Sequence, residues 1–345
     1  MKSACLVGLG KLDLLEIPTP KIEAPDDVLV RVKSCGICGS DIHYYRNGQI
    51  GDAKCKYPHF MGHEPAGVVE DAPKGSPFKP GDRVAIEPGL PCGKCEWCKA
   101  ELFNICPQVR FLASPGMPGA FQEHLAVKTS QLYKIPDSLG FDEAAVLEPL
   151  GVAYHAIADL AELQFGETIA VFGAGPIGLL TLAFAKYSGA SAGYITDPLD
   201  YRLQFAEDYA GADGTIDPAS FDVVDSIMEM TKGRGVDITV DAAGTQQSVD
   251  HALACAAIGG RALLAGIPED EILEYNPHLI RRKELRIFNV RRSNLALEQC
   301  IPFIEGGGMD LKPYVTHNYK LDQVAEAFDV VANYKDGVIK AMINP

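Results

Sequence analysis

The pattern of apolar and polar residues changes near residue 150. Before this point the chain is rich in proline and glycine. Its short runs, such as residues 27–34 and 81–86, have the composition of β-strands. We therefore expect the first part of the chain to form a β-rich domain with many loops.

From residue 151 onward, short apolar runs alternate with stretches that have helical periodicity. This alternation predicts a parallel sheet covered by helices on both faces. The predicted strands are residues 167–173, 191–197, 213–218, 236–244, 260–267 and 284–290, and the predicted helices include 176–189, 199–212 and 246–257. Six strands in this order fit a doubly wound sheet.

The chain is also longer than one hydrophobic core usually serves, because it has 345 residues. After Val290 the pattern becomes mixed helix and loop, and we expect this segment to return to the first domain. The predicted division is therefore a β-rich domain of residues 1–150 and 291–345, and an α/β domain of residues 151–290.

Composition and charge exclude several classes of partner. The hydrophobic fraction of 47% is ordinary for a globular protein, and no stretch is long and apolar enough to cross a bilayer. A net charge of −15 disfavours binding to nucleic acid or to an anionic membrane. Asp13 and Glu16 interrupt the N-terminal segment before any cleavage-like site, so it lacks the pattern of a secretory signal. Ten cysteines without such a signal favour a reducing, cytoplasmic location and metal ligands over disulfides.

Four of the cysteines have metal-ligand spacing within one short loop. The pattern is Cys-x2-Cys-x2-Cys-x7-Cys, formed by Cys92, Cys95, Cys98 and Cys106. Four thiolates can enclose Zn²⁺ tetrahedrally and leave no open position, so this loop predicts a structural zinc site.

A second ligand set has the composition of an open, reactive metal site. Cys38, His63 and Glu64 offer a thiolate, an imidazole and a carboxylate, all of which Zn²⁺ accepts. Glu148 is the candidate for a fourth ligand, directly or through water. Cys35 offers a competing Cys-x-x-Cys pair with Cys38, which we consider the weaker interpretation because Cys38 has better partners.

A glycine fingerprint follows the first strand of the α/β part. The run is Gly173-Ala-Gly175-Pro176-Ile177-Gly178, between a predicted strand and a predicted helix. The glycines allow a tight turn and a close approach to a pyrophosphate, and the helix N-terminus offers free N–H groups to that anion.

Asp197 ends the next predicted strand, where a carboxylate can accept hydrogen bonds from the adenosine ribose and repel a 2′-phosphate. This position favours NAD over NADP. Arg202, five residues later, weakens the preference, since an arginine can accommodate that phosphate. Ligands bind at the carboxyl ends of such strands. The later strand ends that we expect at the nicotinamide end of the cofactor are Ala242, Gly244, Gly266, Ile267, Phe288, Asn289 and Val290.

Together these motifs resemble the zinc-containing medium-chain dehydrogenases, most closely the sorbitol (polyol) dehydrogenase branch. The segments that carry the resemblance are residues 36–52, 62–69, 79–89, 92–106, 147–156 and 171–180. The resemblance implies a GroES-like β-rich catalytic domain plus a Rossmann domain. It implies a catalytic zinc environment of Cys38, His63, Glu64 and Glu148, and a second, structural zinc at the four-cysteine loop.

The resemblance also implies roles around the substrate. Ser40 would line the substrate site, and His43 would either pass a proton outward or hydrogen-bond the cofactor. The proton acceptor would be Glu148 or water held by Glu64. Tyr44, Ile50, Phe111 and Arg291 match positions that line the polyol pocket in relatives, and the assembly would be a homo-oligomer, a tetramer or a dimer.

The predicted activity is the reversible oxidation of a secondary alcohol of a small polyol, such as sorbitol or xylitol, to a ketose with NAD. Alternatives within the family are a threonine 3-dehydrogenase, a butanediol dehydrogenase and a sugar-phosphate or sugar-acid dehydrogenase. The last is raised by the pair Arg291-Arg292, where the branch usually has a basic residue and an aromatic. Segment 114–124 also differs from the sorbitol enzymes. Alternatives outside this chemistry are a zinc-stabilised dinucleotide sensor without turnover and a zinc-free quinone reductase. The complete ligand sets disfavour both.

Overall fold

The computed structural model describes all 345 residues, which divide into two compact units. The first unit comprises residues 1–148, 297–306 and 310–345, and the second comprises residues 149–296 and 307–309. The chain passes from the first unit to the second within one helix, Phe141–Tyr154. It leaves the second unit after Ala296, six residues later than the boundary expected from the sequence.

The first unit is built on a seven-stranded sheet in the order β12-β8-β7-β3-β20-β19, with β11 also paired to β3. Three smaller pairings accompany it: β2-β1-β6, β9-β10 and β4-β5. The strands are β1 (Lys2–Gly8), β2 (Lys11–Glu16), β3 (Asp27–Gly36), β4 (Gln49–Ile50), β5 (Ala53–Lys54), β6 (His59–Phe60), β7 (Glu64–Asp71), β8 (Arg83–Ile86), β9 (Gly89–Leu90), β10 (Arg110–Phe111), β11 (His124–Lys128), β12 (Leu132–Lys134), β19 (Val315–Lys320) and β20 (Lys340–Asn344).

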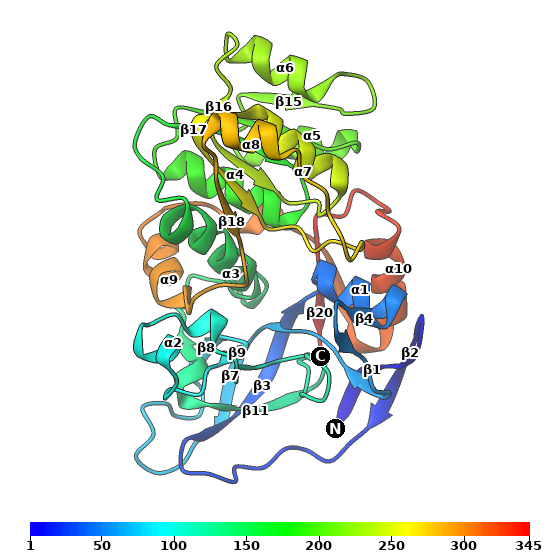
Figure 1. Ribbon diagram of the computed structural model, residues 1–345. Helices are drawn as coiled ribbons and strands as arrows, with labels where there is room; N and C mark the ends of the chain where they lie inside the picture. Colours follow the sequence, from blue (N-terminus) through cyan, green and yellow to red (C-terminus); the bar gives the residue numbers. More distant parts are fainter. The chain divides into compact units, whose positions relative to one another are not determined.

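Short helices connect these strands. They are α1 (Gly39–Asn47), α2 (Glu96–Lys99), α3 (Phe141–Tyr154), α9 (Leu297–Glu305) and α10 (Val324–Ala332), with 3-10 turns at Phe103–Ile105, Thr129–Gln131, Lys312–Tyr314 and Leu321–Gln323. The C-terminal strand closes the sheet. Ile343 of β20 lies opposite Cys35 of β3, so the two strands run side by side although they come from opposite ends of the chain (Figure 1).

The core of the first unit joins its sheet to α10. Phe121 and Phe328 are fully buried and meet edge to face, with ring centroids 6.0 Å apart. Burying each such side chain stabilises the fold by about 1.5–3 kcal/mol. The core therefore ties the C-terminal segment to the N-terminal strands that carry the metal-ligand candidates.

The second unit contains a six-stranded, all-parallel sheet in the order β15-β14-β13-β16-β17-β18. All six strands were predicted from the sequence, and the doubly wound order is confirmed. The strands are β13 (Thr168–Phe172), β14 (Ala192–Thr196), β15 (Gly214–Ile216), β16 (Val236–Asp241), β17 (Ala256–Leu264) and β18 (Arg286–Asn289). The helices are α4 (Pro176–Tyr187), α5 (Asp200–Tyr209), α6 (Val223–Met230), α7 (Gln246–Cys255) and α8 (Pro277–Lys283), with a π-helix at His155–Leu160.

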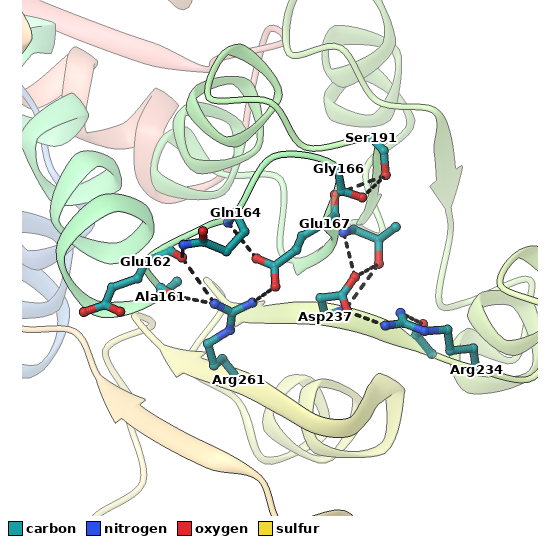
Figure 2. A network of polar contacts seen from close by, with 11 residues as sticks. Ala161, Glu162, Gln164, Gly166, Glu167, Ser191, Arg234, Asp237 and Arg261 are labelled. Atoms are coloured by element: carbon teal, nitrogen blue, oxygen red, sulfur yellow. Dashed lines mark hydrogen bonds and ion pairs between the residues drawn. The ribbon is translucent and has the colours of Figure 1, made fainter.

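A polar network fixes the start of the central strand β13 (Figure 2). Arg261 is 8% exposed, and its guanidinium donates to the Ala161 carbonyl at 2.6 Å and pairs with the Glu167 carboxylate. Asp237 accepts from the Thr168 N–H at 2.9 Å and from Arg234 at 2.5 Å. A buried charge is tolerated only when it is paired in this way. The network anchors β13 to β16 and β17, and β13 leads into the glycine loop.

Candidate functional site

The four-cysteine loop folds into a closed cluster. The sulfur of Cys95 lies 3.4 Å from that of Cys98 and 3.7 Å from that of Cys106, and the Cys92 and Cys98 sulfurs are 4.0 Å apart. A tetrahedral zinc with bonds of about 2.3 Å places its sulfurs about 3.8 Å apart, whereas a disulfide needs about 2.05 Å. The spacing fits a metal and not a disulfide.

Backbone donors around these sulfurs favour thiolates. The Cys98 N–H points to the Cys95 sulfur at 3.4 Å, and the Cys92 N–H to the Cys106 sulfur at 3.5 Å. Hydrogen bonds from the backbone of Lys94 and Cys95 lower the pKa of Cys92 to about 6. Burial and the hydrogen bond with Cys95 raise the pKa of Cys98 to about 12. Thiolates are the form that binds zinc, so Cys92 is already suited to a closed metal site, whereas the Cys98 thiol would lose its proton on binding the ion.

The second cluster is assembled from separate segments. Cys38 precedes α1, His63 lies in the turn before β7, and Glu64 is the first residue of β7. Their ligand atoms all lie within 4.8 Å of one another, and His63 and Glu64 are only 7% and 1% exposed. A thiolate, an imidazole and a carboxylate can hold Zn²⁺ with one position left for substrate or water.

Asp41 contacts the residues of this cluster without belonging to the ligand set. The sequence analysis did not identify it as a site residue. Its carboxylate accepts from the Cys38 N–H at 3.0 Å and the Gly62 N–H at 3.2 Å, and its Oδ1 lies 3.8 Å from His63 Nδ1. Burial raises the pKa of Asp41, while the charge of His63 opposes that rise. Carboxylates beside a ligating histidine orient the ring. The signal available in the sequence was an acidic residue inside the segment 36–43.

Lys340 is a second residue beside this cluster that the sequence analysis did not identify. It is 3% exposed, and its ammonium donates to Glu64 Oε1 at 2.6 Å and to the Ile37 carbonyl at 3.0 Å. Burial lowers the pKa of Lys340, but the charges of Glu64 and Cys38 outweigh it, so the pKa is raised overall. A lone charged residue within the apolar run VIKAMI was the signal that could have revealed it.

Glu148 lies close to the cluster but is not among its three converging residues, Cys38, His63 and Glu64. It is 7% exposed on α3, and burial raises its pKa to about 8, opposed by the charge of His63 and aided by that of Glu64. The competing candidate, Cys35, is fully buried and belongs to neither metal-ligand group. Its pKa is raised well above the ordinary value by burial, so the thiol stays protonated.

The substrate-pocket candidates of the first unit lie on three elements. Ser40, His43 and Tyr44 are on α1, Ile50 is in β4 and Phe111 is in β10. The ring of Phe111 lies 5.5 Å from that of His63, whereas Tyr44 packs edge-on against His59 at 4.9 Å. The structure therefore brings Phe111 directly to the metal cluster.

In the second unit the glycine fingerprint forms the turn between β13 and α4. Gly173 has a left-handed backbone with φ 109°, and a Cβ on Gly178 would lie 1.9 Å from the Gly173 carbonyl oxygen. Gly175 is the N-cap of α4, Pro176 and Ile177 begin the helix, and a Cβ at Gly175 would meet nothing within 4 Å. The turn is closed toward the protein and open at the helix N-terminus, which fits a pyrophosphate.

Asp197 immediately follows β14 and is 4% exposed. Its carboxylate accepts from the Ala174 N–H at 2.8 Å and the Leu199 N–H at 3.0 Å. Arg202 approaches the same carboxylate at 3.3 Å. Asp197 is therefore linked to the glycine turn, and its charge is partly offset.

The remaining cofactor candidates follow the carboxyl ends of neighbouring parallel strands. A Cβ on Gly266 would lie 2.1 Å from the Gly244 nitrogen, so the loops after β16 and β17 touch at these two glycines. Ala242 and Ile267 flank them on the same loops, and Phe288, Asn289 and Val290 end β18 or follow it. Arg291, predicted beside the substrate, is exposed.

Comparison with known proteins agrees with both units. Residues 24–137 match the family described as the alcohol dehydrogenase GroES-like domain, and residues 176–306 match the zinc-binding dehydrogenase family. Sorbitol dehydrogenase of Bacillus subtilis (strain 168) is 38% identical over 348 residues, covering 100% of this chain and 97% of that protein. D-xylulose reductase A of Aspergillus niger is 35% identical over 335 residues, covering 95% and 93%.

A solved structure is similar along its whole length. A protein of Sinorhizobium meliloti 1021, assigned to the zinc-binding dehydrogenases and bound to NADP, superposes with a TM-score of 0.90 at 30% identity. The alignment covers 100% of this chain and 99% of that one. The chain belongs to the zinc-containing medium-chain dehydrogenase family, in its sorbitol (polyol) dehydrogenase branch. No helix of the structure has the length and apolar character that a membrane span requires.

Proposed function

We propose that this protein oxidises a secondary alcohol of a small polyol, such as sorbitol or xylitol, to a ketose with NAD. The observation that carries the proposal is the convergence of Cys38, His63 and Glu64 within 4.8 Å in a chain that also has a complete four-cysteine cluster. A zinc-stabilised sensor without turnover would have no use for the mixed, open ligand set.

Cys38, His63 and Glu64 would hold a Zn²⁺, and Cys92, Cys95, Cys98 and Cys106 a second one, giving two per subunit. When bound, the first ion supplies Lewis-acid polarisation of an alcohol oxygen, and the dinucleotide accepts hydride. Ser40 would take the hydroxyl proton and pass it to Glu148 or to water held by Glu64. His43 would carry the proton outward or hydrogen-bond the cofactor. Phe111 would exclude water beside His63.

NAD is the proposed cofactor because the Asp197 carboxylate would repel a 2′-phosphate. Arg202 lies 3.3 Å from that carboxylate, so the preference over NADP is expected to be moderate. We also propose a cytoplasmic homo-oligomer, a tetramer or a dimer, without nucleic acid or membrane partners.

The test is an initial-rate panel with NAD and with NADP, followed by identification of the products. The substrates are sorbitol, xylitol, sorbitol 6-phosphate, a sugar acid, threonine and 2,3-butanediol. The proposal predicts the highest kcat/KM for a neutral polyol and a ketose as product. Faster turnover of threonine or butanediol than of every polyol would contradict it.

A second candidate is a dehydrogenase of phosphorylated polyols or sugar acids, favoured by the pair Arg291-Arg292. Arg292 is held in the left-handed region at φ 59°, an uncommon conformation for a side chain of this size. Two guanidinium groups can bind an anion bidentately. If wild type prefers sorbitol 6-phosphate and Arg292→Ala abolishes that preference, the second candidate replaces the first.

A further inference from the structure

Asp241 is a buried acidic residue at the carboxyl end of a central strand of the second unit. It is the last residue of β16, is only 1% exposed, and lies opposite Phe172 of β13 and Leu264 of β17. Burying a carboxylate costs free energy unless hydrogen-bond donors compensate it. The donors that Asp241 engages therefore indicate what this residue holds in place.

Three donors of the segment after β16 converge on one oxygen of this carboxylate. Asp241 Oδ1 accepts from the N–H groups of Ala243 and Gly244 at 3.0 and 2.9 Å. It also accepts from the hydroxyl of Ser248, in the first turn of α7, at 2.7 Å. Hydrogen bonds to an ionised acceptor are among the stronger ones. A single side-chain oxygen thus fixes the turn between β16 and α7.

The backbone of Asp241 holds the neighbouring turn. Its carbonyl oxygen accepts from the N–H groups of Ala265 and Gly266, directly after β17, at 2.8 and 3.0 Å. A Cβ on Gly244 would lie 2.9 Å from the nitrogen of Ile267, so the two turns are in direct contact. Asp241 therefore holds the first turn with its side chain and the second with its carbonyl group.

Both turns lie on one side of the glycine loop that follows β13. The strand β14, which leads to Asp197, pairs with β13 on one side, and β16 pairs with it on the other. A dinucleotide crosses the carboxyl edge of a doubly wound sheet at this point. Because Asp197 is the proposed partner of the adenosine ribose, the turns after β16 and β17 belong to the nicotinamide half.

We propose that Asp241 is a positioning residue for the nicotinamide end of the dinucleotide, because it holds the turns after β16 and β17 in the arrangement that receives the ring. The inference rests on the dinucleotide part of the proposed function and is independent of the alcohol substrate. Since all three donors meet at one oxygen, the carbonyl oxygen of an asparagine can replace the carboxylate. An alanine would leave the donors without their acceptor.

The test compares the binding of NADH with that of ADP-ribose, which lacks the nicotinamide ring, by calorimetric titration of the full-length protein without substrate. Asp241→Ala should weaken NADH binding about tenfold and leave ADP-ribose within about twofold of wild type, because the glycine loop and Asp197 stay in place. Asp241→Asn should bind both compounds like wild type. Ser248→Ala removes one donor and should weaken NADH binding about threefold, which provides a test even if Asp241→Ala does not fold.

Asp237→Ala is the matched control. Asp237 lies near the opposite end of the same strand and accepts from the N–H and the hydroxyl of Thr168 at 2.9 and 2.8 Å (Figure 2). This variant should lower Tm, as Asp241→Ala does, but bind NADH like wild type. The comparison separates positioning of the cofactor from general support of the fold.

Three results overturn the inference and leave the proposed function standing. They are unchanged NADH binding in both Asp241→Ala and Ser248→Ala, equal weakening of NADH and ADP-ribose in Asp241→Ala, and a loss of NADH affinity in Asp241→Asn or Asp237→Ala as large as that in Asp241→Ala. If wild-type protein binds neither compound, the proposed NAD-dependent function fails and the inference fails with it.

Discussion

The two metal-ligand clusters of the first unit are built in opposite ways. The closed cluster draws every ligand from residues 92–106, and its geometry is set by one short loop with α2 inside it. The open cluster joins Cys38 to His63 and Glu64 and is bordered by Lys340, which is 276 residues from Glu64. The first depends on local sequence and the second on the pairing of β7, β3 and β20.

This difference has a functional consequence. A metal held by four thiolates has no coordination position open to a substrate, so the closed cluster is expected to contribute to folding. In the open cluster the Glu64 carboxylate is also paired with Lys340, so a metal would share this ligand with the ammonium group. We infer that the reaction takes place at the open cluster, where Lys340, which is not a metal-ligand candidate, balances the charge of Glu64.

The largest effect is expected from the open cluster. His63→Ala removes an imidazole ligand, so the Lewis-acid contribution of several kcal/mol is lost and kcat/KM should fall by about 10³-fold or more. The four-cysteine cluster should keep its metal, and the circular dichroism spectrum should stay that of wild type. A folded His63→Ala variant with near-normal kcat/KM would exclude His63 from the site.

The closed cluster should respond in stability. Cys98→Ser replaces a buried ligand, so we expect one fewer zinc per subunit, a Tm lower by several degrees and a changed emission of Trp97, the only tryptophan, which lies in α2. Metal analysis, thermal unfolding and fluorescence check this. If Cys98→Ser instead abolished turnover while leaving Tm and emission unchanged, the roles of the two clusters would be reversed.

The dinucleotide site of the second unit provides a contrast, because no metal-ligand group lies there. Asp197→Ala removes the charge that would repel a 2′-phosphate, so the ratio of kcat/KM for NAD to that for NADP should fall about tenfold. Metal content should not change, and neither should Tm by more than a few degrees. A wild-type protein that is faster with NADP at limiting cofactor would contradict this interpretation of Asp197.

The smallest effect concerns pH. Burial lowers the pKa of His251 below its ordinary value of 6.5, and the charges of Asp222 and Asp250 oppose that change. A folded-state pKa that is depressed means that the unfolded chain binds the proton more readily. The stability from neutral His251 is therefore present above pH 6.5 and is lost as the pH falls below it.

Between pH 7.5 and 5.5, Tm of His251→Gln should fall about 1 °C less than Tm of wild type, a small difference because the ring is partly in solvent. Loss of metal in acid affects both proteins equally and cancels in this comparison. Identical pH profiles would show that His251 has no part in acid sensitivity.

The contrast between the clusters also explains what could be predicted. The four-cysteine loop is defined by spacing alone, and the six strands of the second unit follow from their apolar runs. The run VIKAMI marks Lys340 as an unusual charge, but its place beside Glu64 follows only from the pairing of β20 with β3, a contact between distant parts of the chain. The sequence predicts that the chain returns to the first unit at residue 291, whereas it returns at Leu297. Residues 290–296 are irregular and give no periodic signal that could mark the boundary.

The most direct test of the account is stepwise chelation of the full-length protein, followed by zinc analysis, polyol oxidation and Trp97 emission. The account predicts that the first zinc to leave carries away the activity without changing Trp97 emission, and that added Zn²⁺ restores turnover. The second zinc should leave only with a change in Trp97 emission. Activity that survives the loss of the first zinc, or that disappears together with the Trp97 signal in one phase, would contradict the division of labour between the two clusters.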